Sequence, residues 1–210
     1  MRKSWIVITA LAGAALAIPH PSAAEVTLQS ENAFVVAHSV EIAAPKVDVW
    51  RALISPAKWW SSDHTWSGDA ANLYLDSQAT GCFCEKLPLP KDAPAGSRTG
   101  SVEHMHILYV APGTALRMAG GLGPLQSEAV KGVLTITLKP HEGGTRILWE
   151  YSVGGYMRYE TPKIAALVDK VVAEQLGRLG AKLGLVAAPP AATKSELPAP
   201  AAEKPSVDPG

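Results

Sequence analysis

The chain has little of several residue types that mark special protein classes. Only two cysteines occur in 210 residues, and the 19 basic side chains are matched by 19 acidic ones. Two cysteines exclude a disulfide-dense scaffold, and the balanced charge leaves no electrostatic footprint for nucleic acid or for an anionic membrane. With 47% hydrophobic and 18% charged residues, the composition is that of a soluble globular protein.

The common catalytic and nucleotide-binding signatures are also missing. No P-loop, G-x-S-x-G or H-E-x-x-H pattern occurs, which removes the usual phosphate-binding loop and the two commonest hydrolase signatures. The run Gly120–Pro124 is rich in glycine but has neither the G-x-G-x-x-G spacing nor a following helix. We therefore expect a mobile loop beside a cavity mouth, and no cofactor.

The N-terminal segment is typical of a secretory signal peptide. Two basic residues precede a 14-residue apolar run, Trp5 to Ile18, and small residues end the segment at Ala24. A membrane anchor is the alternative, but crossing a bilayer takes roughly 20 apolar residues. We expect cleavage after residue 24 and a protein that is periplasmic or secreted, without a membrane span.

Composition divides the remaining chain into three parts. Residues 25–33 form a short lead-in, and residues 34–185 are long enough for one hydrophobic core. Residues 186–210 contain six prolines and seven alanines without apolar periodicity, which predicts a disordered tail. We expect the domain to be a monomer.

Hydrophobic periodicity predicts the elements of the domain. Residues 34–42 indicate a strand, and Pro45 and Pro56 open two short helices. Six more strands are expected near residues 73–77, 80–87, 98–110, 114–119, 130–139 and 145–154. A long helix begins at Thr161, and its apolar stripe consists of Ile164, Leu167, Val168, Val171, Val172, Leu176, Leu179 and Leu183.

The helix and the sheet can bury their apolar faces only against each other, which favours a curved sheet wrapped around the helix. The order of elements, with the helix start Pro45–Trp50, the pair Trp59-Trp60 and the strand Thr80–Glu85 followed by Gly100–Glu103, resembles the START-like helix-grip (SRPBCC) superfamily. The resemblance is to its polyketide cyclase and heat-shock ATPase activator-like branch, in an exported member. It implies an α+β helix-grip fold with about six to seven antiparallel strands. It also implies a cavity between sheet and helix that holds a small molecule or is filled with side chains.

Strand alternation selects the side chains that face this cavity. Aromatic and methionine side chains suit a flat apolar ligand, whereas ordinary core packing is the alternative interpretation. Tryptophans 59, 60 and 66 either cap the cavity or pack the short helices. The candidate ligand-binding residues are Trp59, Trp60, Phe83, Glu85, Met105, Ile107, Met118, Trp149 and Tyr151.

Glu85 is the candidate catalytic residue, because alternation places its carboxyl group among apolar side chains. Burial would raise its pKa and suit it to act as a general base, with Tyr151 or a histidine as partner. The alternatives are a salt bridge to Arg117 or Arg146, or an exposed strand end.

A second group of side chains is expected on the opposite face of the sheet. If Cys82 lies across from His104, then Cys84 and His106 complete a possible zinc or copper site. A register slip of one residue would send one pair to the other face. We expect two free thiols, with a Cys82–Cys84 disulfide as the alternative in an oxidising compartment.

The sequence therefore favours an exported domain that binds a small hydrophobic or amphipathic molecule between sheet and helix. The alternatives are an enzyme of the cyclase or dehydratase kind that uses Glu85, and a protein-interaction module without a ligand.

Overall fold

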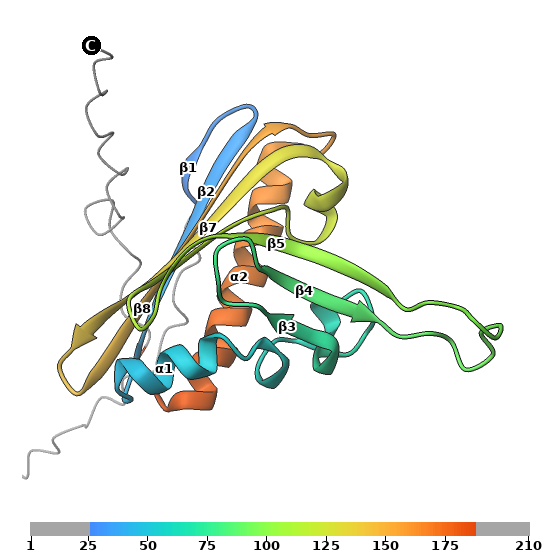
Figure 1. The fold of residues 1–210 in the computed structure, drawn as a ribbon. Coiled ribbons are helices and arrows are strands. Elements are labelled where there is room, and N and C mark those ends of the chain that lie inside the picture. The colour runs from blue at the N-terminus through green and yellow to red at the C-terminus, as the bar shows by residue number, and fades with distance from the viewer. Residues whose placement is uncertain (1–25, 188–210) are drawn as a thin grey trace, which may run out of the picture.

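The computed structural model describes residues 26–187 as an antiparallel sheet wrapped around one long helix (Figure 1). The expected signal peptide lies outside the described residues, and so does all of the expected tail except its first two residues. Within residues 26–187, no helix combines the length and the apolar character that crossing a bilayer requires.

The sheet has nine strands among the described residues. Eight of them follow one path in the order β1-β2-β8-β7-β6-β5-β4-β3, and β9 pairs with β2. The strands are β1 (Val26–Gln29), β2 (Ala33–Ile42), β3 (Leu73–Leu75), β4 (Cys82–Leu87), β5 (Gly100–Ala111), β6 (Ala115–Ala119), β7 (Ala129–His141), β8 (Gly144–Tyr156) and β9 (Leu185–Ala187).

The α+β class and the helix-grip arrangement are as predicted, but the number of strands is larger than six to seven. The additional strands are β1, which falls in the expected lead-in, and β9, which reaches into the expected tail. Each has only three or four residues, which is too short to give a readable alternation. Their pairing with β2 becomes visible only in the folded chain.

Residues 26–187 also form two α-helices and four 3₁₀ turns. Helix α1 is Lys46–Leu53, and the second short helix expected after Pro56 is the 3₁₀ turn η1 (Pro56–Lys58). The other turns are η2 (Ser62–His64), η3 (Ala70–Asn72) and η4 (Gly123–Ser127). Helix α2 (Thr161–Leu183) begins with proline in its first turn and ends at Gly184, whose φ of 82° is left-handed.

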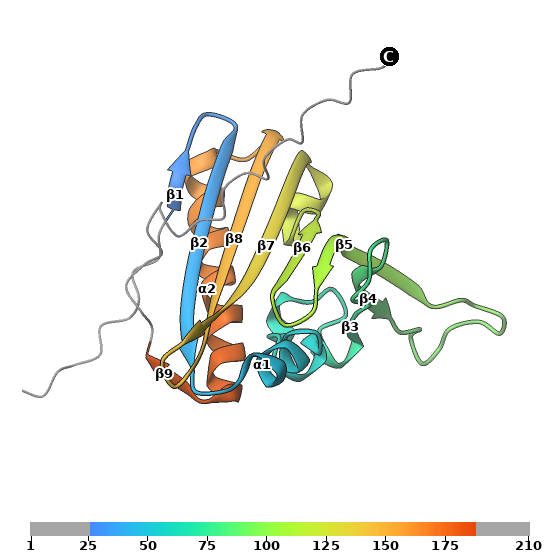
Figure 2. The same cartoon turned by 60° about the vertical axis from the view of Figure 1, so that its left-hand side comes forward.

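The core lies between α2 and the curved sheet (Figures 1 and 2). Five of the predicted stripe residues are buried there: Ile164, Val168, Val172, Leu176 and Leu179. The same helix also buries Asp169, which lies 2.7 Å from the Nε2 atom of His38 on β2. This hydrogen-bonded pair connects α2 to the sheet. Separating the two side chains would leave buried polar groups without partners, which would destabilise the fold.

Candidate functional site

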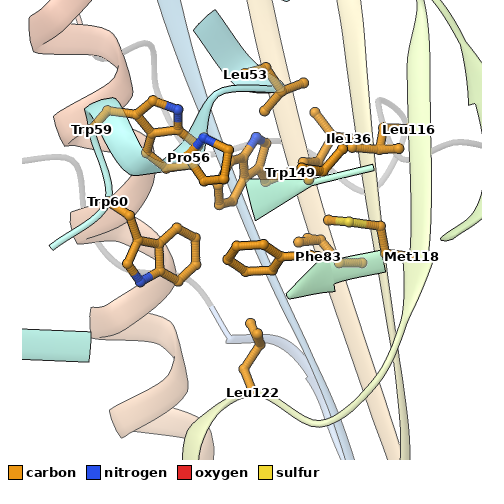
Figure 3. Close-up of a pocket in the computed structure, with 12 residues that line it drawn as sticks. Leu53, Pro56, Trp59, Trp60, Phe83, Leu116, Met118, Leu122, Ile136 and Trp149 are labelled. Carbon is orange, nitrogen blue, oxygen red and sulfur yellow. The ribbon is translucent and has the colours of Figure 1, made fainter. Parts of the chain in front are cut away.

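The space between the sheet and the short helical segments α1 and η1 is filled with side chains rather than open; Figure 3 shows the side chains that line it. Its remaining volume is about 20 Å³, enough for about one water molecule. The ring centroids of Trp60 and Phe83 are 5.1 Å apart, and those of Trp59 and Trp149 are 6.0 Å apart. These aromatic rings therefore pack against one another and fill most of the space themselves.

The nine candidate ligand-binding residues therefore divide into two groups. Those that line the small space are Trp59, Trp60, Phe83, Met118 and Trp149. Glu85, Met105, Ile107 and Tyr151 are buried but do not line it. Of the nine, only Trp60 also borders a larger cleft outside the filled interior. A role of the others in ligand binding stays a prediction.

The larger cleft has a volume of about 430 Å³, within the range of small-molecule sites. Its walls are α2, the loop that contains η2, the residues at the start of η4, and His104 of β5. Leu167 of α2 borders the cleft with 60% of its surface exposed, so this part of the predicted stripe is not packed into the core. The lining residues are Trp60, Asp63, His64, Thr65, Trp66, His104, Leu122, Gly123, Pro124, Ile164, Leu167, Val168, Val171 and Val172.

The first loop wall is fixed to α2 by hydrogen bonds. The backbone N–H of Ser61 donates to the side-chain oxygen of Gln175 at 2.9 Å. Arg178 donates to the backbone oxygen of Trp59 at 2.9 Å, and His64 lies 3.0 Å from a carboxylate oxygen of Glu174. These hydrogen bonds hold this wall of the cleft in place.

The second loop wall, Gly120–Pro124, is fixed by Tyr151. The Tyr151 hydroxyl donates to the Gly120 carbonyl at 2.9 Å and accepts from the Leu122 N–H at 3.2 Å. Burial raises the pKa of Tyr151, so the hydroxyl stays protonated. Gly132 must lack a side chain here, because a Cβ atom would collide with the Gly120 carbonyl and the Tyr151 hydroxyl. The loop lies beside the cleft, as the sequence predicts. It was expected to be mobile, but these contacts hold it in place.

A β-bulge decides where His104 points. Phe83 pairs with Met105, but the next residue of β4, Cys84, pairs with Glu103, so His104 is one extra residue on β5. As a result, His104 and Met105 are both buried although they are neighbours in the chain. Cys82 pairs with His106 rather than with His104, which corrects the predicted register.

The bulge brings His104 to Glu85. The Nε2 atom of His104 lies 2.9 Å from a carboxylate oxygen of Glu85, whose surface is 0% exposed. Backbone N–H groups of Trp66 and Ser67 donate to the same carboxylate at 3.0 and 2.5 Å. Burial raises the pKa of Glu85, but the hydrogen bonds from Ser67, Trp66 and His104 outweigh it and leave the pKa below its ordinary value.

These contacts correct two expectations for Glu85. Its pKa is lowered rather than raised, so the carboxylate is ionised and already occupied by donors. Its charged partner is neither Arg117, which donates to Thr135, nor Arg146, which lies 3.8 Å from Glu41. Glu85 orients other groups and does not border the cleft.

The protonation of His104 follows from its surroundings. Burial lowers its pKa, and the hydrogen bond and charge of Glu85 offset this only in part. The imidazole is therefore neutral at neutral pH. Because an ionised carboxylate can only accept, Nε2 carries the hydrogen and Nδ1 keeps a free lone pair. Within residues 26–187, no hydrogen bond engages Nδ1, and the ring borders the cleft.

Cys82 and Cys84 form a disulfide, so the expectation of two free thiols is wrong. Their Cα atoms are 5.4 Å apart, closer than the roughly 6.6–6.8 Å of a regular strand. The chain between the two cysteines is therefore locally compressed. The Cα–Cα distance of a regular extended strand therefore gave no indication of the disulfide.

The disulfide and the bulge together exclude the possible metal site at Cys82, Cys84, His104 and His106. Both sulfur atoms are bonded to each other, and His104 is bonded to Glu85 instead of lying beside His106. In the described part of the chain, no group of three or more histidine, cysteine or acidic side chains is arranged to hold a metal ion.

Sequence reasoning found part of the cleft lining, because Trp60, Trp66 and the Gly120–Pro124 loop were expected beside a cavity. It missed the exposed flank of the helix, because Leu167 and Val171 were expected to be part of a buried stripe. One signal was present: Leu167 and Val171 are four residues apart on one flank of an unusually wide apolar stripe.

Comparisons with known proteins support no function. No protein-family model and no curated protein matches the chain. Solved structures resemble it at low identity. A Mesorhizobium loti protein is 17% identical, with 70% of this chain and 94% of that one covered and a TM-score of 0.46.

Two more solved structures are similar to the same degree. A Chromobacterium violaceum protein is 18% identical, covers 71% of this chain and 96% of its own, and has a TM-score of 0.45. A conserved protein of unknown function from Enterococcus faecalis is 15% identical, with 74% of each chain covered and a TM-score of 0.46. Scores this low carry no argument about function.

Proposed function

We propose that the protein is an exported member of the START-like helix-grip superfamily that binds a small hydrophobic or amphipathic molecule. The ligand site is the cleft of about 430 Å³ that α2 borders, not the small filled space between the sheet and the segments α1 and η1. The family assignment rests on the resemblance of the sequence and on the order of the elements.

The observation that carries the proposal is the apolar helix wall of a fixed cleft. Leu167 is largely exposed and Val171 is half-buried, and both border the cleft. Ligand sites are concave, mostly apolar and largely formed in advance, with a few polar groups for orientation. The hydrogen bonds that fix both loops keep the cleft formed without a ligand.

The alternative functions have weaker support. An enzyme that uses Glu85 as its base conflicts with the burial of this carboxylate and with its lowered pKa. A protein-interaction module has no specific feature in its favour, because the cleft is concave rather than flat.

Binding of a neutral fluorophore tests the proposal. N-phenylnaphthylamine, which brightens in apolar surroundings, is titrated into the purified protein. We expect saturable binding that Leu167→Glu weakens at least tenfold, because a carboxylate would be buried against the probe. Ala166→Glu is the matched control, since Ala166 is exposed on α2 and lies outside the cleft lining. It should bind like the parent protein.

Two outcomes would overturn this function. One is the absence of saturable binding by the parent protein. The other is an equal loss of binding in Leu167→Glu and Ala166→Glu, which would locate the probe elsewhere. Native mass spectrometry of the protein from its own host supplies the mass of any bound compound.

A further inference from the structure

The polar side chains that border the cleft differ in how many of their hydrogen-bonding atoms already have a partner. The Thr65 hydroxyl donates to the Ser62 carbonyl at 2.7 Å, and His64 is paired with Glu174. Asp63 is exposed at the rim, where water solvates its charge. His104 alone among these four is buried, and its Nδ1 atom has no partner in the described part of the chain.

The hydrogen bond to Glu85 fixes what His104 offers to a ligand. A carboxylate with three N–H donors holds the imidazole by Nε2, and the neighbouring Phe83 ring lies 5.0 Å from the imidazole centroid. With Nε2 as the donor to Glu85, Nδ1 is the hydrogen-bond acceptor of the neutral ring. The acceptor is therefore oriented before any ligand arrives.

We propose that His104 Nδ1 is the polar anchor of the cleft and that it accepts a hydrogen bond from a neutral hydroxyl group of the ligand. The apolar body of this ligand lies along Leu167 and Val171. This inference rests on the proposed function and names the chemical class of the ligand: a phenol or alcohol with a hydrophobic body. A buried acceptor with this geometry discriminates strongly against analogues that leave it unpaired.

The same arrangement disfavours anionic ligands. A carboxylate placed at Nδ1 would face a lone pair, with the charge of Glu85 behind the ring and that of Asp63 at the rim. Like charges destabilise such a complex, and the cleft lining offers no arginine or lysine to compensate.

Three probes with one ring system separate these contributions. Naphthol carries the hydroxyl donor, methoxynaphthalene has the same oxygen without the hydrogen, and naphthoate carries a negative charge. At neutral pH, we expect the protein to bind naphthol about tenfold more tightly than either of the others.

Two variants assign this preference to one residue. His104→Phe keeps a planar ring without an acceptor, and it should bind naphthol and methoxynaphthalene equally. His106→Phe is the matched control, because His106 is two residues away, half-buried and outside the cleft lining. It should keep the preference of the parent protein.

A measurement on the parent protein makes the test independent of how the variants fold. The ¹⁵N resonance of His104 Nδ1 should shift toward that of a hydrogen-bonded acceptor on addition of naphthol, and should stay unchanged with methoxynaphthalene. An unchanged resonance with bound naphthol would overturn the assignment.

The outcomes distinguish this inference from the function on which it rests. If no probe binds, the proposed function fails. If the probes bind with equal affinity, or if His104→Phe keeps the preference for naphthol, the cleft remains a ligand site but His104 is not its anchor.

Discussion

His104 and Glu85 come from neighbouring strands and meet with 2.9 Å between Nε2 and a carboxylate oxygen, both almost fully buried. The same carboxylate receives the backbone N–H groups of Trp66 and Ser67. Glu85 therefore joins β4 and β5 to the loop that forms one wall of the cleft. The pair links the stability of the fold to the shape of the candidate site.

Replacement of Glu85 should lower the stability of the fold. Glu85→Gln substitutes an amide for a carboxylate that accepts from three donors, so at least one donor loses its partner. We expect the free energy of unfolding in urea to fall by about 3 kcal/mol. Glu103→Gln on the next strand is the control, because this side chain is exposed, and it should change stability by no more than about 0.5 kcal/mol. Equal effects would mean that the Glu85 contacts contribute nothing specific.

Acid should destabilise the protein in two stages. His104 and Glu85 have lowered pKa values in the folded state, so the unfolded chain binds more protons just below their ordinary values of 6.5 and 4.5. Stability therefore declines as pH falls below 6.5, and declines further below 4.5. Urea midpoints measured across this range check the decline. His104→Phe should lack its first stage; an identical profile in the variant would contradict the assignment.

The Tyr151 hydroxyl should control the order of the Gly120–Pro124 loop. Tyr151→Phe removes the hydrogen bonds to the Gly120 carbonyl and the Leu122 N–H, so we expect a loss of about 1–2 kcal/mol in stability. Amide exchange at Leu122 should accelerate, and binding of N-phenylnaphthylamine should weaken. Tyr109→Phe, at an exposed tyrosine, serves as the control. If exchange at Leu122 is unchanged, another contact fixes the loop.

The disulfide should be present in protein purified without reductant. Its intact mass should lack two hydrogens, and thiol titration should find no free cysteine. Because the bond closes a very short loop, we expect its reduction to lower the free energy of unfolding by only about 1–2 kcal/mol. The double variant Cys82→Ala/Cys84→Ala should be insensitive to reductant. Two titratable thiols in the native protein would refute the bond.

The order of the elements could be predicted because its signals are local. The β-branched run at 34–42, the prolines at 45 and 56, and the apolar spacing after Thr161 act within a few residues of one another. The structure places a strand, two short helical segments and a long helix there. Strands β1 and β9 escaped prediction because segments of three or four residues carry no period.

The sequence predicted which residues of the candidate site carry chemistry, but not how they are arranged. Glu85, His104, Cys82 and Cys84 were all identified as chemically interesting, but on the wrong faces or with the wrong partners. Alternation assumes an unbroken register, and the extra residue at His104 breaks it, so that His104 and its neighbour Met105 are both buried.

The sequence by itself determined the α+β class, the helix stripe and the aromatic core, because hydrophobic burial acts on a pattern that the chain carries locally. The tertiary structure alone decided which polar groups meet. His38 pairs with Asp169 across 131 positions, and His104 turns from the cysteines to Glu85. Such pairs depend on register and on the distance between atoms of separate elements, and both are settled only when the whole sheet closes around α2.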